Sequence, residues 1–221
     1  YCINQSKRNF TRLELSPEEL AKAFLGYYNR GLVNGLFLSS GISSDVESTM
    51  ENQIETVHLL RKKYGYDDYI HLKIVPGASK DSIKRAMALA NRVSINIEAA
   101  TPSGLAELSS TKDYNKDILK RLSWIDSLHD KSTTYPNSTH TTQLIVGANS
   151  ESDMEILNRM EKIYKKTNLK RTYFSAFTPI EGTDLENKVE CSTDRTKILY
   201  NADSLLNDYK FKLKELVFDK D

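Results

Sequence analysis

Residues 69–98 read YIHLKIVPGASKDSIKRAMALANRVSINIE, and this stretch decides the fold class. Tyr69 to Val75 and Arg92 to Glu98 are apolar, β-branched runs that predict strands. Between them, Ser79 to Asp81 has the residues that begin a helix. A strand, a helix and a second strand in this order predict two parallel strands joined by a crossover helix.

The same alternation continues on both sides of that stretch. Further strands are expected at Gly35 to Ser40, Thr142 to Val146 and Arg171 to Phe177. Helices are expected from Ser16 to about Arg30, over Met50 to Tyr64, after a cap at Ser103, over Asp113 to Leu128, from Ser150 to Asp153 onward and over Ile198 to Phe218. Asp130 to His140 and Pro179 to Thr196 are polar and predict loops.

Five strands that alternate with helices predict either a doubly wound sheet or a full or partial barrel. No glycine-rich phosphate loop of the Rossmann or P-loop kind follows any of the strands, which favours the barrel. The sequence therefore predicts an α/β fold, a partial barrel of parallel strands, in a single domain over residues 1–221.

Composition and charge exclude several classes of protein. Thirty-one basic residues nearly balance 30 acidic ones, so the net charge of +1 gives no global signature of nucleic-acid binding, and such a partner needs a local basic patch. A run of this kind, Lys162, Lys165, Lys166, Lys170 and Arg171, is typical both of a solvated helix face and of phosphate contacts. No run of 18 apolar residues occurs, so we expect a cytoplasmic protein with no membrane partner.

Two cysteines, Cys2 and Cys191, are too few for a disulfide framework. The chain opens at Tyr1-Cys2-Ile3-Asn4 without an initiator methionine, and we expect it to be a processed product or a fragment. By itself each cysteine is more readily interpreted as incidental than as a metal ligand.

Reactive residues of a parallel barrel gather at the carboxyl ends of its strands, so polar residues at those ends are candidate site residues. They are Ser39, Ser40 and Gly41 after the first strand, Lys73 on the second, Asn96 and Glu98 on the third, Gln143 and Gly147 on the fourth, and Ser175 on the fifth. If Lys73, Asn96, Glu98 and Gln143 face the lumen, burying each one unpaired costs about 1–3 kcal/mol, which a polar ligand would relieve. A structural hydrogen-bond network, or strands whose polar residues face the helices, would satisfy the same pattern.

Several segments together resemble the radical S-adenosylmethionine (SAM) enzymes, in particular a group assigned to DNA modification or repair. Tyr1-Cys2-Ile3-Asn4 resembles the end of their CxxxCxxC loop, and a helix like the one that Ser16-Pro17-Glu18-Glu19-Leu20 begins follows it there. The other matching segments, in the same order and spacing, are Gly35–Gly41, Tyr69–Ala78, Arg92–Glu98, Thr142–Gly147 with Glu151 and Asp153, and Leu169–Ser175. The resemblance covers roughly residues 1 to 210.

This resemblance implies a partial (β/α)6-type TIM-like barrel. It also implies a [4Fe–4S] cluster held by three cysteine thiolates, with SAM bound to the open iron and cleaved after one-electron reduction to a 5′-deoxyadenosyl radical. A flavodoxin- or ferredoxin-like protein would supply the electron, and a nucleic acid would be the substrate. The first two cluster cysteines are expected to precede residue 1, so that this chain begins at the third and is inactive alone.

The resemblance also assigns roles to the candidate residues. Cys2 matches the third cluster cysteine, the one metal ligand expected here. Ser39, Ser40 and Gly41 match the strand end that meets the SAM amino group, and Lys73 is placed near its carboxylate. Asn96 and Glu98 match the strand that contacts the ribose, Gln143 to Gly147 the strand beside the adenine, and Ser175 the last strand beside the cofactor.

Two other classes of function remain open at this stage. The chain could be a cluster-free barrel enzyme in which Lys73 forms a Schiff base and Glu98 acts as general base. It could instead be a noncatalytic remnant or a binding module. Trapping with borohydride and a carbonyl substrate would distinguish the lysine enzyme from the other two.

Overall fold

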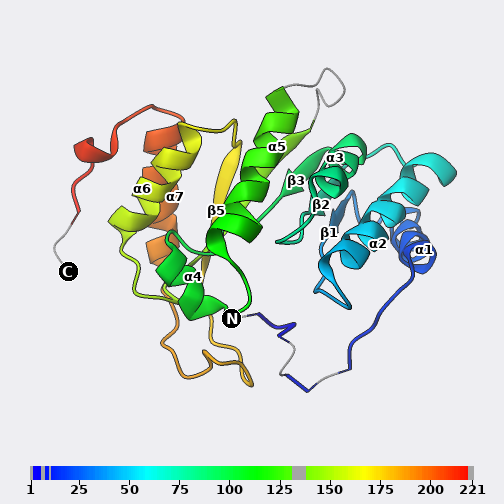
Figure 1. Cartoon of the computed structure of the whole chain (residues 1–221), viewed down its shortest axis with the longest axis horizontal. Coiled ribbons are helices and arrows are strands. Elements are labelled where there is room, and N and C mark those ends of the chain that lie inside the picture. The colour runs from blue at the N-terminus through cyan, green and yellow to red at the C-terminus, as the bar shows by residue number, and fades with distance from the viewer. Residues whose placement is uncertain (1, 6–7, 10, 131–137, 219–221) are drawn as a thin grey trace. The chain divides into compact units, whose positions relative to one another are not determined.

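A computed structural model describes residues 2–5, 8–9, 11–130 and 138–218 (Figure 1). These residues form two compact units, which we describe separately. The β1–β3 unit comprises Phe10–Ile95 and Lys116–His140. The β4–β5 unit comprises Tyr1–Asn9, Asn96–Asn115 and Thr141–Asp221.

The β1–β3 unit alternates strands and helices as the sequence predicts. Its elements are α1 (Pro17–Tyr28), β1 (Leu36–Leu38), α2 (Val46–His58), η1 (Leu59–Lys63), β2 (Ile70–Lys73), α3 (Lys80–Leu89), β3 (Arg92–Ser94) and α5 (Lys120–Asp130). The segment η2 (Tyr114–Leu119) leads into α5, and η1 and η2 are both π-helical turns. The predicted strand–helix–strand stretch is thus β2, α3 and β3.

Local sequence explains where these helices begin. The Ser16 side chain accepts from the Glu19 N–H while the Glu19 carboxylate accepts from the Ser16 N–H, and Pro17 occupies the first helical position. Ser79 caps α3 by accepting from the Ser82 N–H. The predicted starts at Ser16 and Ser79 are therefore confirmed.

The register of β1, β2 and β3 separates two faces of their sheet. Leu38, Leu72 and Val93 are aligned across the three parallel strands and are buried. Their neighbours Phe37, His71 and Arg92 are also aligned and lie on the other face, where Phe37 is exposed and the other two are half-buried. The apolar face forms the core of this unit.

The β4–β5 unit contains α4 (Pro102–Leu108), most of β4 (Thr139–Val146), α6 (Asp153–Tyr164), β5 (Arg171–Ala176), α7 (Thr193–Asn207) and η3 (Leu213–Glu215). Helix α6 packs on α7, and α7 packs on β5 (Figure 1). Ser152 and Glu155 form a capping box at the start of α6, as the polar stretch Ser150 to Asp153 predicts.

A buried polar cluster ties three elements of this unit together. The Tyr164 hydroxyl of α6 donates to the Asp203 carboxylate of α7, 2.9 Å from both oxygens, and lies 2.8 Å from the Thr172 hydroxyl of β5. Asp203 is only 6% exposed, and burial raises its pKa to about 6. Burial and the nearby Asp203 charge also raise the pKa of Tyr164.

Strands β1, β2 and β3 pair in parallel in chain order, and β4 pairs in parallel with β5. The predicted α/β class and parallel strands are confirmed.

Several predicted boundaries are wrong. The first three strands are shorter than predicted, since they end at Leu38, Lys73 and Ser94. Ile74, Val75, Ile95 and Ile97 are buried as expected of strand residues but lie beyond the strand ends. Thr101, not Ser103, caps α4, since Pro102 occupies the first helical position and the Thr101 hydroxyl accepts from the Gly104 N–H.

The predicted loops and the last helix also differ from the structure. Strand β4 already begins at Thr139, inside the loop predicted for Asp130 to His140, of which residues 131–137 lie outside the described residues. Ser192 caps α7, so this helix begins within the predicted Pro179 to Thr196 loop and ends at Asn207 rather than at Phe218.

Candidate functional site

Two of the predicted site residues, Asn96 and Glu98, are brought together with a lysine that sequence reasoning missed. Asn96 and Glu98 follow β3 in the chain and are 7% and 6% exposed. The Glu98 carboxylate accepts from Lys112 Nζ at 3.3 Å and from Asn96 Nδ2 at 3.5 Å. Lys112 lies between α4 and η2, in a stretch whose composition gives no signal of a site.

The backbone of Glu98 has a left-handed conformation, with φ of 63°. This region is unfavourable for a residue with a side chain and persists only where neighbouring contacts hold it. Here the Glu98 N–H donates to Gln143 O at 3.0 Å, and the Ile145 N–H donates to Glu98 O at 2.8 Å. Two hydrogen bonds to β4 therefore keep the Glu98 side chain directed toward Asn96 and Lys112.

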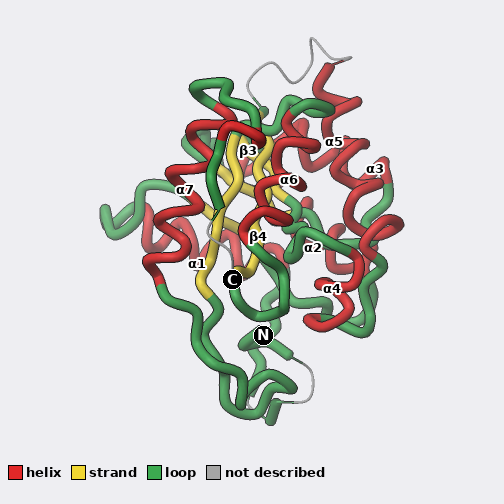
Figure 2. Tube along the Cα trace, turned by 90° about the vertical axis from the view of Figure 1, so that its left-hand side faces the viewer, coloured by secondary structure: helices red, strands yellow, loops and turns green. Residues whose placement is uncertain are grey.

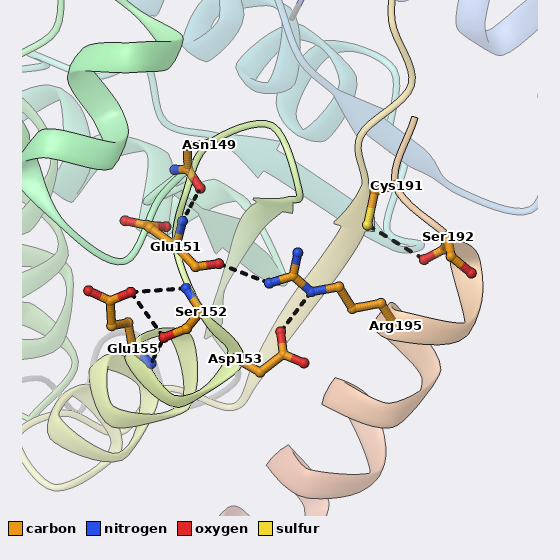
Figure 3. Close-up of polar contacts among 8 residues, drawn as sticks. All are labelled: Asn149, Glu151, Ser152, Asp153, Glu155, Cys191, Ser192 and Arg195. Carbon is orange, nitrogen blue, oxygen red and sulfur yellow. Dashed lines mark hydrogen bonds and ion pairs between the residues drawn. The ribbon is translucent and has the colours of Figure 1, made fainter. Parts of the chain in front are cut away.

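The residues after Glu98 are held by the carboxylate of Glu151, which follows β4. It accepts from the N–H groups of Ala100 and Thr101 at 2.8 and 2.7 Å, and from the Thr101 hydroxyl at 2.6 Å. Glu151 is buried, so these charge-assisted bonds lie in a protected environment. The Glu151 carbonyl in turn accepts from Arg195 of α7, whose guanidinium also pairs with Asp153 at 2.8 Å (Figure 3).

The carbonyl oxygens of the same turn also accept hydrogen bonds from side chains. Tyr114 Oη lies 3.0 Å from both the Ala99 and Ala100 carbonyl oxygens, and Arg159 Nε donates to Ala100 O at 2.5 Å. The Arg159 guanidinium lies over the Tyr114 ring, 5.3 Å from its centroid, in a cation–π contact. Burial raises the pKa of Tyr114 to about 12, so its hydroxyl stays protonated and can donate.

A glycine leaves the space that Glu151 occupies. A Cβ atom at Gly104 in α4 would overlap Glu151 Oε1 and would lie 2.6 Å from Asn149 Nδ2. Such an overlap requires the carboxylate to move, which would break its bonds to Ala100 and Thr101. Gly104 is therefore part of the support of the turn that follows Glu98.

Gln143 and Ser175, both predicted site residues, contact each other across β4 and β5. Gln143 Nε2 donates to Ser175 Oγ at 2.8 Å, and both side chains are half-buried on the same face of the strands. Gln143 also contributes its carbonyl oxygen to the Glu98 N–H. The strand end that carries Gln143 therefore positions Glu98 through its backbone.

Gly147 follows the last residue of β4 with a φ of 82°, a conformation that favours glycine. A Cβ atom there would lie 2.6 Å from Cys191 Cβ and 2.7 Å from Cys191 Sγ, so glycine also allows the approach of this buried cysteine. The Cys191 N–H donates to Phe177 O at 2.9 Å, which closes the base of the loop between β5 and α7. That Gly147 also lies beside the adenine of a bound ligand stays a prediction.

Cys2 is exposed and lies in a segment fastened to that same loop. Gln5 Nε2 donates to Asp184 Oδ2 at 2.9 Å, and Arg8 Nε donates to Glu181 O at 2.9 Å. Figure 2 shows these N-terminal residues beside the long loop. The loop thus has a structural role that its polar composition alone does not reveal.

The remaining predicted residues belong to the β1–β3 unit. Ser39, Ser40 and Gly41 follow β1 and are exposed, and the Ser40 hydroxyl donates to Gly41 O at 2.6 Å. Lys73 ends β2, aligned with Ser94 of β3, and is half-buried. That Lys73 shares a lumen with Asn96, Glu98 and Gln143 stays a prediction.

In the cluster of Asn96, Glu98 and Lys112, the Glu98 carboxylate has hydrogen-bond acceptor capacity beyond its two contacts. A carboxylate has several acceptor sites, and Glu98 uses its own for one amide and one ammonium group. Its remaining sites can accept from a vicinal diol such as a ribose. Among the described residues no group of three or more His, Cys, Asp or Glu side chains is arranged to hold a metal ion.

Comparison of the chain with protein-family models gave no match, and neither did comparison with curated protein sequences. Among the residues that the structure describes, no helix has the length and the apolar character needed to span a membrane.

Proposed function

We propose that this chain is the SAM-binding part of a radical SAM enzyme, with the ribose of SAM held by Glu98 and Asn96. The observation that carries the proposal is the buried cluster of Asn96, Glu98 and Lys112, with Glu98 in a left-handed conformation shortly after β3. Strained backbone at a buried polar cluster is typical of a binding site. The alternation of parallel strands and helices within each unit supports the further proposal of a partial (β/α)6-type barrel.

The residues present fit SAM better than they fit the iron–sulfur cluster. Hydroxyl groups need an acceptor, and Glu98 supplies one that is held in place by its backbone. A [4Fe–4S] cluster open to SAM needs three thiolates, whereas the chain contains only Cys2 and Cys191, one exposed and one buried in the loop after β5. Reductive cleavage of SAM is the chemistry that the resemblance implies.

What the chain itself does in this proposal is to bind and orient. Glu98 accepts from the ribose hydroxyls, and Lys112 balances the charge of the carboxylate when the ligand covers it. Asn96 donates to Glu98 and limits its rotation. Glu151, through Ala100 and Thr101, keeps the turn after Glu98 in one conformation.

Calorimetric titration of the chain with SAM tests the proposal. We expect saturable binding, weaker binding of an analogue that lacks both ribose hydroxyls, and a loss of affinity of about tenfold or more in Glu98→Gln, because a hydrogen bond to a charged group is lost. Glu14→Gln, which changes the same functional group at an exposed position, should bind as the unmodified chain does.

Two results would count against this function. If SAM does not bind at millimolar concentration and Lys73 is trapped with a carbonyl compound and borohydride, the chain is a lysine-based barrel enzyme. If SAM does not bind and no carbonyl compound is trapped, the chain is a noncatalytic remnant or a binding module. Lys73→Met should abolish trapping in the first case.

We also propose a nucleic-acid substrate and a flavodoxin- or ferredoxin-like electron donor, both implied by the resemblance. The net charge of +1 gives no general attraction for the phosphate backbone of a nucleic acid. Binding therefore needs a local concentration of basic side chains.

A further inference from the structure

Basic residues are concentrated in two segments of the β4–β5 unit. Residues 161–171 contain five basic side chains and one acidic, and residues 208–215 contain three and two. These nineteen residues therefore carry a net charge of +5 in a chain whose net charge is +1, which leaves −4 on the rest of the chain. Such a concentration creates a positive local potential in an otherwise acidic molecule.

The two segments are neighbours in the structure. Residues 161–171 run from the end of α6 to the start of β5, and η3 packs against α6. The Leu213 N–H donates to Glu161 Oε1 at 3.3 Å, which joins the segments directly. We call the exposed basic side chains of both segments the basic surface: Lys162, Lys165, Lys166, Lys170, Arg171, Lys210, Lys212 and Lys214.

Most of these charges are available to a partner. Within the described part of the chain only Lys165 of this surface forms an ion pair, with Glu161 at 2.9 Å. The acidic residues of the two segments are engaged locally, since Asp208 accepts from the Ser204 hydroxyl and Glu215 from the Lys212 N–H. Both carboxylates keep their charge, but the eight basic side chains outnumber the three acidic ones of the two segments, so the surface stays positive.

Exposed aromatic rings lie among these lysines. Tyr209 is 71% and Phe211 46% exposed, and each lies next to Lys210 in the chain. The Arg171 guanidinium lies 5.5 Å from the centroid of the Tyr173 ring and 5.8 Å from that of Tyr200. Lysines that meet phosphates and exposed rings that stack on bases are the two features of surfaces that bind single-stranded nucleic acid.

We propose that the basic surface anchors a single-stranded nucleic acid. This inference rests on the nucleic-acid part of the proposed function. It adds which surface of the chain binds the nucleic acid and that the nucleic acid is single-stranded. An acidic lipid or protein surface would also satisfy the lysines, but only the bases of a nucleic acid would stack on Tyr209 and Phe211.

The anchor is distinct from the candidate SAM site. In parallel strands β4 and β5, Arg171 pairs with Thr141 at the amino end, whereas Val146 pairs with Ala176 at the carboxyl end. Glu98 bonds to Gln143 and Ile145, toward the carboxyl end. The basic surface therefore binds the nucleic acid away from Glu98 and acts as an anchoring site.

Fluorescence anisotropy of a labelled oligo-dT 20-mer, measured without SAM at several salt concentrations, tests the proposal. Each phosphate contact on a single strand contributes about −0.7 to the slope of log affinity against log salt. The variant Lys162→Gln/Lys166→Gln/Lys212→Gln should therefore have a slope shallower by about 2. Its matched control removes three exposed lysines of the β1–β3 unit, Lys62→Gln/Lys80→Gln/Lys84→Gln, and should keep the original slope.

The aromatic residues separate a nucleic acid from other polyanions. Tyr209→Ala and Phe211→Ala should each weaken oligo-dT binding about fivefold or more while leaving heparin binding unchanged, because heparin has no bases to stack. Circular dichroism melting checks that both variants remain folded.

The outcomes separate the surface from the proposed function. Equal loss of affinity in the two triple-lysine variants, or equal effects of the aromatic variants on oligo-dT and heparin, would overturn the assignment of this surface and leave a nucleic-acid substrate standing. Absence of oligo-dT binding by the unmodified chain would overturn the surface together with the nucleic-acid part of the function. Binding of SAM is measured separately and depends on neither result.

Discussion

Compared with the unmodified chain, the variant Asp203→Asn should gain stability in the β4–β5 unit as the pH rises from below 4 to above 6. Asp203 is buried, accepts from the Tyr164 hydroxyl, and has a pKa raised by burial from 3.8 to about 6. A raised pKa means that the folded state binds the proton more tightly than the unfolded state does. This contribution to stability is fully present below pH 3.8 and is lost as the pH rises through 6.

The magnitude follows from the size of the shift. A change of about two pKa units corresponds to about 3 kcal/mol between pH 4 and pH 7.5. The asparagine side chain of the Asp203→Asn variant does not ionise, and its amide oxygen can still accept from Tyr164. The difference in free energy of unfolding between Asp203→Asn and the unmodified chain should therefore rise by roughly 3 kcal/mol, or about 6–12 °C in melting temperature, over this range.

Urea unfolding of both proteins from pH 4 to pH 7.5, followed by circular dichroism, measures this difference. Burial and the charges of Arg92 and Lys73 lower the pKa of His71 to about 4, so His71 increases stability as the pH rises. Because His71 is present in both proteins, its effect cancels in the difference between them. Asp67→Asn, at an exposed position, is the matched control. A pH-independent difference between Asp203→Asn and the unmodified chain would refute the reasoning.

Three further results follow from the same structure. Gly104→Ala should destabilise the chain by about 1–2 kcal/mol in urea unfolding, because displacing Glu151 costs more than the roughly 1 kcal/mol that alanine adds to helix stability. Glu151→Ala, which removes the overlapping atoms, should remove most of the extra effect. Gly147→Ala should lower the melting temperature, because position 147 has a φ of 82° and an added Cβ would meet Cys191. Cys191→Gly should then restore part of the lost stability. If it restores none, the loss comes from the backbone conformation alone. The His71 ring should remain neutral at about pH 5.5 in an NMR titration, and protonation with a midpoint near its ordinary value of 6.5 would contradict its burial.

Local sequence predicts the parts of this fold that depend on residues close together in the chain. The start of α1 could be predicted because Ser16, Pro17 and Glu19 form their capping interactions within one turn. Strand positions could be predicted because apolar, β-branched residues favour buried strands wherever they are placed. Strand lengths could not, since hydrogen bonding to a neighbouring strand decides where a strand ends.

The candidate site divides in the same way. Asn96 and Glu98 could be identified from sequence because polar residues at the end of an apolar strand are unusual. Lys112 and Glu151 could not be assigned their contacts, because they lie 14 and 53 residues beyond Glu98 and meet its vicinity only in the folded chain. Glu151 resembles an ordinary acidic residue at the start of α6, yet its carboxylate binds the N–H groups of Ala100 and Thr101.

The sequence by itself determined the α/β class, the order of the elements and the polar residues at strand ends, since these depend on residue type and local spacing. The tertiary structure alone decided that Glu98 adopts a left-handed conformation, because hydrogen bonds to Gln143 and Ile145 hold it there. It also decided that the basic residues at and after the end of α6 lie beside those around η3. Long-range contacts bring together side chains that no local pattern can associate.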